Sequence, residues 1–243
     1  MWVRAIVAYD GTDYEGFQRQ PNRRTVQGVL EDALEQVTGR RTTILAAGRT
    51  DTGVHAEGQV IAFDVDWGHA LGELRDALNA VLPPDIAIRA VERVPPDFHP
   101  RYDAISRRYR YTLYNHPVRS PLARRYSLHV ARPLNLAAMQ AAAALLVGTH
   151  DFAAFGRPPK GTNAVRHVFQ AHWQAQWPWL YFDIEADAFL YRMVRTLVGT
   201  MIRVGLGRLT VDDFREILLS RNPRLAGPAV PARGLCLVEV KYD

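Results

Sequence analysis

The order of short apolar runs along the chain constrains its fold most. Residues 2–9 alternate apolar and polar side chains, as a half-buried strand does. Thr25 then opens a helix whose apolar face ends before Gly39. The other elements expected in this part are strands at 44–47, 59–65 and 86–94 and a helix at 70–82. The first part of the chain therefore has the order βαββαβ.

The second part of the chain repeats this order of elements without repeating its sequence. The expected elements are strands at 107–114, 167–174, 180–186 and 235–240 and helices that begin at Asn135, Phe189 and Thr210. Both parts then follow the split βαβ pattern of RRM-like and ferredoxin-like folds. We expect an α+β protein of two βαββαβ halves, residues 1–97 and 98–243, that form a pseudo-twofold pair around a basic catalytic cleft.

The basic residues indicate a nucleic-acid partner. The 243 residues include 30 Lys and Arg against 25 Asp and Glu, and only Lys160 and Lys241 are lysines. Arginine presents a planar fork of donors that suits phosphate oxygens and stacks on bases. A GC-rich genome or a hot habitat would also enrich arginine. However, three of four arginine clusters lie in or beside apparent loops, which favours a functional basic surface. The clusters are Arg19/Arg23/Arg24, Arg40/Arg41, Arg101/Arg107/Arg108/Arg110 and Arg119/Arg124/Arg125.

Several kinds of chemistry lack their sequence motif. The chain has no G-x-x-x-x-G-K-[ST], no G-x-S-x-G and no H-E-x-x-H. His167 and His172 would point to opposite faces of a strand, so no metal site is expected. The single cysteine, Cys236, excludes a disulfide framework, and no apolar stretch approaches the roughly 20 residues of a membrane span. We therefore expect a cytoplasmic protein, without a membrane span, whose side chains act without a metal or cofactor.

A polar loop between two apolar strands is the candidate catalytic segment. It reads A-G-R-T-D-T-G-V-H over 47–55, and Gly48 and Gly53 permit tight turns and close approach of a ligand. In an extended segment Arg49 and Asp51 lie on one side, so the guanidinium could keep the carboxylate ionised and aimed. An ionised, positioned aspartate can act as a nucleophile. The alternative is a surface loop with a turn-forming Asp and a paired Arg.

This loop and three further segments resemble a known family. The segments are Y-D-G-T-D-Y-E-G-F-Q-R-Q at 9–20, R-R-Y-R-Y-T-L-Y at 107–114 and F-L-Y-R-M-V-R at 189–195. In their order and spacing, over nearly the whole chain, they resemble the tRNA pseudouridine synthase A family. The pair G-R-T-D-x-G-V-H and Y-D-G-T-x-Y-x-G-F-Q-x-Q is highly specific for it.

The resemblance implies a cofactor-free isomerase. Such an enzyme detaches the uracil of uridines at positions 38, 39 and/or 40 of the tRNA anticodon stem-loop and rejoins it through carbon. By this resemblance Asp51 is the nucleophile, Arg49 orients the flipped nucleotide, Tyr109 stacks on the target base and Arg195 pairs with Asp51. The family also implies a homodimer whose subunits both contribute to docking one tRNA by its anticodon stem-loop and body.

The residue patterns alone leave several roles open. Tyr109 and Tyr111 share one strand face, so one of them belongs to the core. Arg195 lies on an apolar helix and either extends to water or pairs with an acid. The loop 156–162 fits an RNA-gripping lid and a tolerated surface insertion equally well. The candidate RNA contacts near the N-terminus are Gln18, Arg19, Gln20, Arg23 and Arg24, although loop amides are more often only solvated.

A non-catalytic RNA-binding protein of two RRM-like units is the alternative function. The element order and the basic charge suit both functions, but the aromatic strand K/R-G-F/Y-G/A-F-V-x-F/Y is missing. A purely structural oligomerisation domain would leave the arginine-rich loops without a purpose. The sequence also leaves open which uridines and which tRNAs are modified, whether Asp51 attacks C6 of the base or assists departure at C1′ of the sugar, and which group removes the C5 proton.

Overall fold

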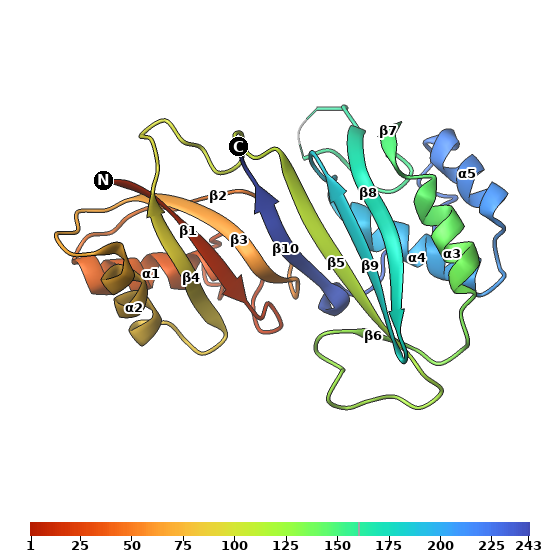
Figure 1. Cartoon of the computed structure of the whole chain (residues 1–243), viewed down its shortest axis with the longest axis horizontal. Coiled ribbons are helices and arrows are strands. Elements are labelled where there is room, and N and C mark those ends of the chain that lie inside the picture. The colour runs from red at the N-terminus through yellow and green to blue at the C-terminus, as the bar shows by residue number, and fades with distance from the viewer. Residues whose placement is uncertain (160) are drawn as a thin grey trace. The chain divides into compact units, whose positions relative to one another are not determined.

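The chain divides into two compact units in a computed structural model that describes residues 1–159 and 161–243 (Figure 1). Unit 1 consists of Met1–Ile105 and Cys236–Asp243, and unit 2 consists of Ser106–Leu235. Within the described residues, five α-helices accompany strands that pair mostly in antiparallel fashion. The expected α+β class is therefore confirmed.

Unit 1 is built on a sheet with the strand order β4-β1-β3-β10, and β2 pairs with β3. Neighbouring strands are antiparallel except for β10, which runs parallel to β3. Up to β4 the elements follow the expected order βαββαβ. These elements are β1 (Trp2–Tyr9), α1 (Val26–Thr38), β2 (Leu45–Ala46), β3 (His55–Asp64), α2 (Leu71–Val81) and β4 (Ile86–Arg93). The seventh element of the unit is β10 (Leu235–Lys241), the last strand of the chain.

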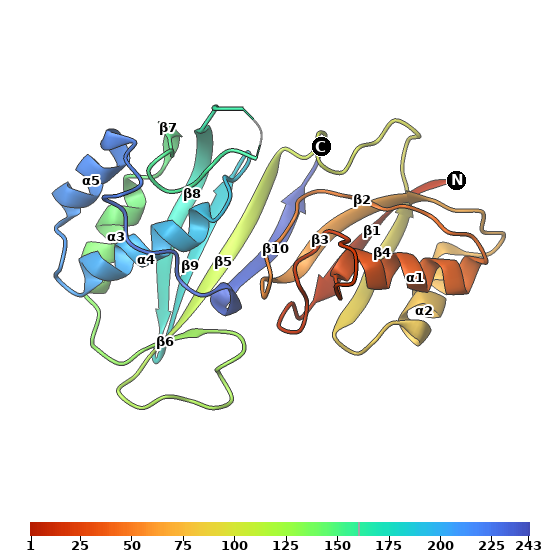
Figure 2. The same cartoon turned by 180° about the vertical axis from the view of Figure 1, so that it is seen from behind.

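Local signals explain why these elements of unit 1 form where they do. The Thr25 hydroxyl accepts a hydrogen bond from the Gly28 N–H at the start of α1, and Gly39 ends the helix with a φ of 70°. Strict alternation along β1 buries Val3, Ala5 and Val7 completely. Figure 2 shows α1 and α2 together on one side of the unit 1 strands, where they cover this buried face.

Unit 2 has a sheet of antiparallel neighbours in the order β5-β9-β8-β7, and the short strand β6 runs parallel to β5. Its helices α3, α4 and α5 pack against one another, and each of them also contacts a strand of the sheet (Figure 2). The elements are β5 (Ser106–Asn115), β6 (Leu128–Val130), α3 (Leu136–Ala144), β7 (Gly148–Asp151), β8 (Val165–Gln176), β9 (Trp179–Ala186), α4 (Met193–Gly205), α5 (Val211–Ser220) and the 3-10 turn η1 (Ala232–Gly234).

The expected second βαββαβ half, residues 98–243, is not confirmed. The sequence prediction missed β6 and β7, which have only three and four residues. The last strand, expected to complete the second half, pairs with β3 through Cys236 opposite His55 and so belongs to unit 1. Its apolar pattern shows that the strand is buried but does not specify its partner. The units also divide at 105/106 instead of 97/98.

Helix α4 begins at Met193, four residues after the expected start. Arg192 precedes it with a φ of 61°, in the left-handed region, so the backbone cannot continue a helix through this residue. The apolar residues before it, at 189–191, suit a helical pattern but lie in irregular structure. Apolar spacing alone therefore placed this boundary too early.

Candidate active site

The candidate catalytic loop, residues 47–54, connects β2 to β3 in unit 1. The Phe17 N–H donates a hydrogen bond of 3.0 Å to the Thr50 carbonyl, which ties the loop to the N-terminal glycine-rich segment. A second bond of 3.1 Å closes a four-residue turn over 51–54. Gly53 supplies the positive φ, 77°, that this turn needs at its third position. The backbone around residue 51 is therefore held on both sides.

A buried polar network lies under this loop. The Tyr9 and Thr50 hydroxyls are 2.7 Å apart, and the Gln59 amide donates to the Gly48 carbonyl at 2.9 Å. The same amide nitrogen lies 3.5 Å from the Tyr9 hydroxyl. Gln59 is fully buried, and Tyr9 and Thr50 are nearly so. The network thus anchors Gly48 and Thr50, the two neighbours of Arg49.

The two charged residues of the loop are less buried than the threonine between them. Arg49 is exposed and Asp51 is half-buried, whereas Thr50 between them is buried. Successive side chains of an extended segment alternate between its two sides. In an extended segment the buried, anchored Thr50 would place its two charged neighbours on the opposite, more exposed side.

Glycines allow the segment 10–17 to pack directly on the catalytic loop. A Cβ atom on Gly11 would lie 2.0 Å from the Val54 carbonyl oxygen, and one on Gly16 would lie 3.1 Å from the Thr50 carbonyl oxygen. Gly16 also has a φ of 85°. Only glycine permits such close approach of two backbones, which explains the two glycines of the Y-D-G-T-x-Y-x-G-F motif.

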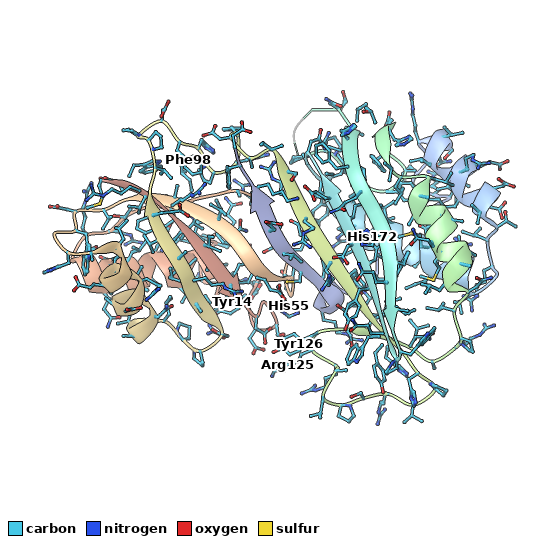
Figure 3. All side chains as sticks on the ribbon, viewed as in Figure 1. Tyr14, His55, Phe98, Arg125, Tyr126 and His172 are labelled. Carbon is cyan, nitrogen blue, oxygen red and sulfur yellow. The ribbon has the colours of Figure 1, made fainter. Side chains whose placement is uncertain are left out.

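His55 joins this contact at the start of β3 (Figure 3). The Gly11 N–H donates a hydrogen bond of 3.1 Å to its Nδ1. Asp10 lies 3.1 Å from the same nitrogen, and its Oδ1 also accepts from the N–H and the hydroxyl of Thr12. The buried imidazole therefore links the N-terminal segment to the residues that follow Asp51.

A second cluster holds the N-terminal segment against β4. The Tyr14 hydroxyl donates to Asp85 at 2.5 Å, and Arg24 bonds to both residues while its guanidinium lies 4.3 Å from the centre of the Tyr14 ring. Burial, and then the Asp85 carboxylate, raises the pKa of Tyr14 above its ordinary value. The Tyr14 phenol therefore stays a neutral donor.

The expected RNA contacts of the N-terminal segment are largely engaged within unit 1. Gln18 is exposed, whereas the Gln20 amide donates to the Glu15 carbonyl at 2.9 Å. The three arginines each face carboxylates, and the bond to Glu31 is the main cause that raises the pKa of Arg19. The ion pairs are Arg19 with Glu31 at 2.9 Å and Asp32 at 3.2 Å, Arg23 with Glu15 at 2.7 Å, and Arg24 with Asp85 at 3.1 Å.

The two tyrosines of β5 in unit 2 have different surroundings. Tyr111 is fully buried, its hydroxyl donates to the Pro231 carbonyl at 2.7 Å, and burial raises the pKa of its phenol. Tyr109 is half-buried, and its ring meets Phe189 edge-on with 5.0 Å between ring centres. The expectation that one of the two belongs to the core is confirmed, and the core residue is Tyr111.

Arg195 lies in the first turn of α4, in unit 2. Its Nε donates to the Val230 carbonyl at 2.7 Å, and the Val230 N–H donates to the Arg195 carbonyl at 3.2 Å. The side chain is half-buried. Its guanidinium is thus oriented by backbone and does not simply extend into water.

The sequence of the chain matches a family model described as tRNA pseudouridine synthase over residues 5–103 and 142–243. A protein of Moorella thermoacetica named tRNA pseudouridine synthase A is 46% identical, with 99% of each chain covered. The chain belongs to the tRNA pseudouridine synthase family. Proteins of the same name from Syntrophotalea carbinolica and Chloroflexus aurantiacus are 44% and 47% identical over 99% of this chain, and 96% and 88% of theirs is covered.

Membership in this family confirms the resemblance that the motifs indicated. It makes the chain an isomerase that acts on tRNA and decides against the non-catalytic RNA-binding alternative.

Among solved structures, one from a Cbf5-Nop10-Gar1 complex is similar over 83% of this chain and 53% of that chain, at 12% identity. The TM-score of 0.35 is too low to establish a common fold.

No individual role was assigned from the sequence to three residues that lie around the catalytic loop. Tyr9, His55 and Gln59 all contact the loop or the segment packed on it. The sequence did mark Gln59 as unusual, because it is a polar residue at the start of an apolar run that was expected to be a strand. A buried polar side chain needs hydrogen-bond partners, and here it finds them in the loop.

Other expectations concern the loop 156–162 and bound ions. Gly156 packs so closely against Leu190 and Tyr191 that a Cβ atom would lie 2.7 and 2.9 Å from their atoms, so the start of this loop is anchored. Lys160 lies outside the described residues.

In the described ranges no group of three or more His, Cys, Asp or Glu could hold a metal ion. No helix in those ranges is long and apolar enough to cross a membrane.

Proposed function

We propose that this chain isomerises uridine to pseudouridine at positions 38, 39 and/or 40 of the tRNA anticodon stem-loop, with Asp51 as the nucleophile. Family membership supports the reaction and the substrate class. One observation carries the residue assignment: Asp51 follows a threonine that is locked into the buried Tyr9–Thr50–Gln59 network. A nucleophile must be positioned before the substrate arrives, and this network supports such positioning.

The reaction conserves every atom of the nucleotide. The N1–C1′ bond breaks, a C5–C1′ bond forms, N1 gains a proton and C5 loses one. Asp51 is the only acid between residues 47 and 54, so it alone in that loop offers a carboxylate to form a transient bond at C6 of the base or at C1′ of the sugar. When the bond to Asp51 breaks, the carboxylate is regenerated and no co-reactant is consumed.

The target base must leave its stack before it can react. Extrusion costs a few kcal/mol, and an aromatic face can offset part of the lost stacking. We assign this role to Tyr109, because its ring is half-buried and held by Phe189, whereas Tyr111 belongs to the core. Arg49 is proposed to orient the flipped nucleotide and Arg195 to pair with Asp51.

The proposal includes a homodimer that docks one tRNA by its anticodon stem-loop and body. This part rests on the resemblance to the family and on the excess of basic over acidic residues. Sedimentation velocity of the full chain, alone and with tRNA, tests it. A chain that sediments as a monomer at micromolar concentration would contradict the dimer.

The activity itself is tested with unmodified tRNA transcripts. The purified chain is incubated with them, and pseudouridines are mapped by their carbodiimide adducts. We expect modification confined to positions 38–40, and heat-denatured protein serves as the control. If no pseudouridine forms in the anticodon arm of any tRNA, the proposed function is wrong.

A further inference from the structure

The basic charge of this chain is concentrated in one acid-free stretch of unit 2. Residues 106–150 contain no Asp or Glu, whereas the whole chain has 25 acidic residues against 30 basic ones. Seven of the basic residues lie in this stretch, so the rest of the chain has 23 basic and 25 acidic residues. The net positive charge therefore comes from this stretch alone. Its arginines are Arg107, Arg108, Arg110, Arg119, Arg124, Arg125 and Arg132.

The arginines of β5 and those of the following loop have different partners. Arg110 makes two hydrogen bonds to the buried Asp183, at 2.9 and 3.1 Å, and Arg107 donates to the Asp187 carbonyl at 2.8 Å. Arg119 and Arg124, on the loop between β5 and β6, are exposed. In the part of the chain that the structure describes, neither forms an ion pair. These two guanidiniums are available to an external anion.

The loop between β5 and β6 is held by its own hydrogen bonds. The side chain of His129 bonds to the His116 carbonyl at 2.7 Å, and the Ser127 hydroxyl donates to the Ala123 carbonyl at 2.8 Å. Figure 1 shows this loop as a long excursion between the two strands, and Figure 3 labels Arg125 and Tyr126 on it. The His129 bond therefore joins the two ends of the loop, and the Ser127 bond holds the segment that leads into β6.

Residues 118–124 of this loop combine cationic and apolar side chains, and we refer to this segment as the arginine tip. Leu122 is 94% exposed and Val118 is 67% exposed, and both lie between or beside Arg119 and Arg124. Folding alone does not explain an almost fully exposed leucine between two arginines without carboxylate partners. Arginines that bind phosphate beside an apolar side chain that packs on a sugar or an unstacked base are typical of RNA recognition.

We propose that the arginine tip binds the RNA backbone of the substrate, with Arg119 and Arg124 on phosphates and Leu122 against an unpaired nucleotide. This inference rests on the proposed function for its choice of substrate. It moves the phosphate contacts from Arg19, Arg23 and Arg24, which carboxylates already neutralise, to arginines without such partners. A second copy of the tip is a poor partner, because two acid-free loops would bring like charges together.

The test uses the full chain with Arg119→Gln and Arg124→Gln combined. The control combines Arg40→Gln and Arg215→Gln, which removes the same charge from exposed arginines that pair with Asp64 and Asp212. Filter binding measures tRNA affinity between about 50 and 200 mM salt. We expect the tip variant to bind about tenfold more weakly or worse at the lower salt, with a log–log salt slope reduced by about 1 to 2. The control should keep the wild-type slope.

Two further measurements sharpen the result. At subsaturating tRNA the single-turnover rate of the tip variant should fall about as much as its affinity does, because the lost contacts act in binding. Leu122→Ser should weaken binding several-fold without changing the salt slope, because an apolar contact releases no counterions.

Three outcomes separate the inference from the proposed function. If the tip variant and the control bind tRNA with equal affinity and slope, the inference is overturned. It is also overturned if the tip variant changes the oligomeric state in sedimentation velocity, since a second copy would then be the partner. Wild-type chain that binds tRNA but forms no pseudouridine would refute the proposed function, while the binding comparison would still decide about the tip.

Discussion

Replacing Gln59 by leucine should separate the stability of the fold from the positioning of the catalytic loop. Gln59 is fully buried, and its amide nitrogen donates to the Gly48 carbonyl at 2.9 Å, while its Oε1 has no partner among the described residues. The side chain therefore brings one favourable and one unfavourable term to the folded state. Leucine is close to it in size and removes both.

The two terms are of similar size. Without the bond the Gly48 carbonyl has no side-chain donor, which lowers the free energy of unfolding by about 1 to 3 kcal/mol. Removing an unpartnered buried oxygen raises it by a similar amount. The free energy of unfolding should therefore stay within about 1 kcal/mol of wild type. For a chain of this length that corresponds to a melting temperature within about 4 °C. Catalysis should fall at least about tenfold, because the residue before Arg49 loses its anchor.

Asn115→Leu is the matched control. The Asn115 amide donates to the carbonyls of Val130 at 2.7 Å and Arg132 at 2.8 Å, and its oxygen is not among the unpartnered buried atoms. Nothing offsets this loss, so the free energy of unfolding should fall by about 2 to 4 kcal/mol. Thermal unfolding and single-turnover rates of the folded protein are measured for both variants. The reasoning is refuted if Gln59→Leu is the less stable variant, or if it reacts at the wild-type rate.

Three further pairs of substitutions test other parts of the structure. Gly11→Ala should destabilise the protein by roughly 2 kcal/mol or more in thermal unfolding, because its Cβ would lie 2.0 Å from the Val54 carbonyl oxygen. Its control is Gly72→Ala in α2, which has open space around it and should be neutral or stabilising. Arg110→Ala should lower the free energy of unfolding by about 2 to 4 kcal/mol, because it leaves the buried Asp183, 2% exposed, without its main partner. Arg215→Ala, on the exposed pair with Asp212, should lower it by at most about 1 kcal/mol. Equal losses of stability would contradict this account. Tyr109→Ala should lose about 1 to 3 kcal/mol of base stacking in kcat/KM, and Tyr109→Phe should retain most of it; normal turnover by Tyr109→Ala would remove Tyr109 from the site.

Short-range signals in the sequence predicted the elements whose ends they define. Alternation placed β1 at residues 2–9, and Thr25 and Gly39 marked the two ends of α1. Thr210 and Asp213 form the expected capping box at the start of α5. Each of these signals acts between residues that are at most a few positions apart, so the sequence displays it directly.

Long-range pairing was not visible in the sequence. The parallel pairing of β10 with β3 joins Cys236 to His55, and no local pattern specifies it. The motif located the catalytic loop, but its support comes from Tyr9 and Gln59, which lie 50 positions apart. The same limit applied to Arg24, whose partner Asp85 is 61 positions away. Charge clusters in the sequence therefore indicated basic surface where the fold supplies carboxylates.

The most direct test of the central claim is single-turnover release of tritium from C5-labelled uridine in tRNA by Asp51→Asn. Asparagine keeps the shape of the side chain and removes the charge and the nucleophile. Asp76→Asn, on an exposed pair with Arg75, is the matched control and should react like wild type. We predict that Asp51→Asn binds tRNA at least as tightly as wild type while tritium release falls below detection. Release within about tenfold of the wild-type rate would contradict a catalytic role for Asp51.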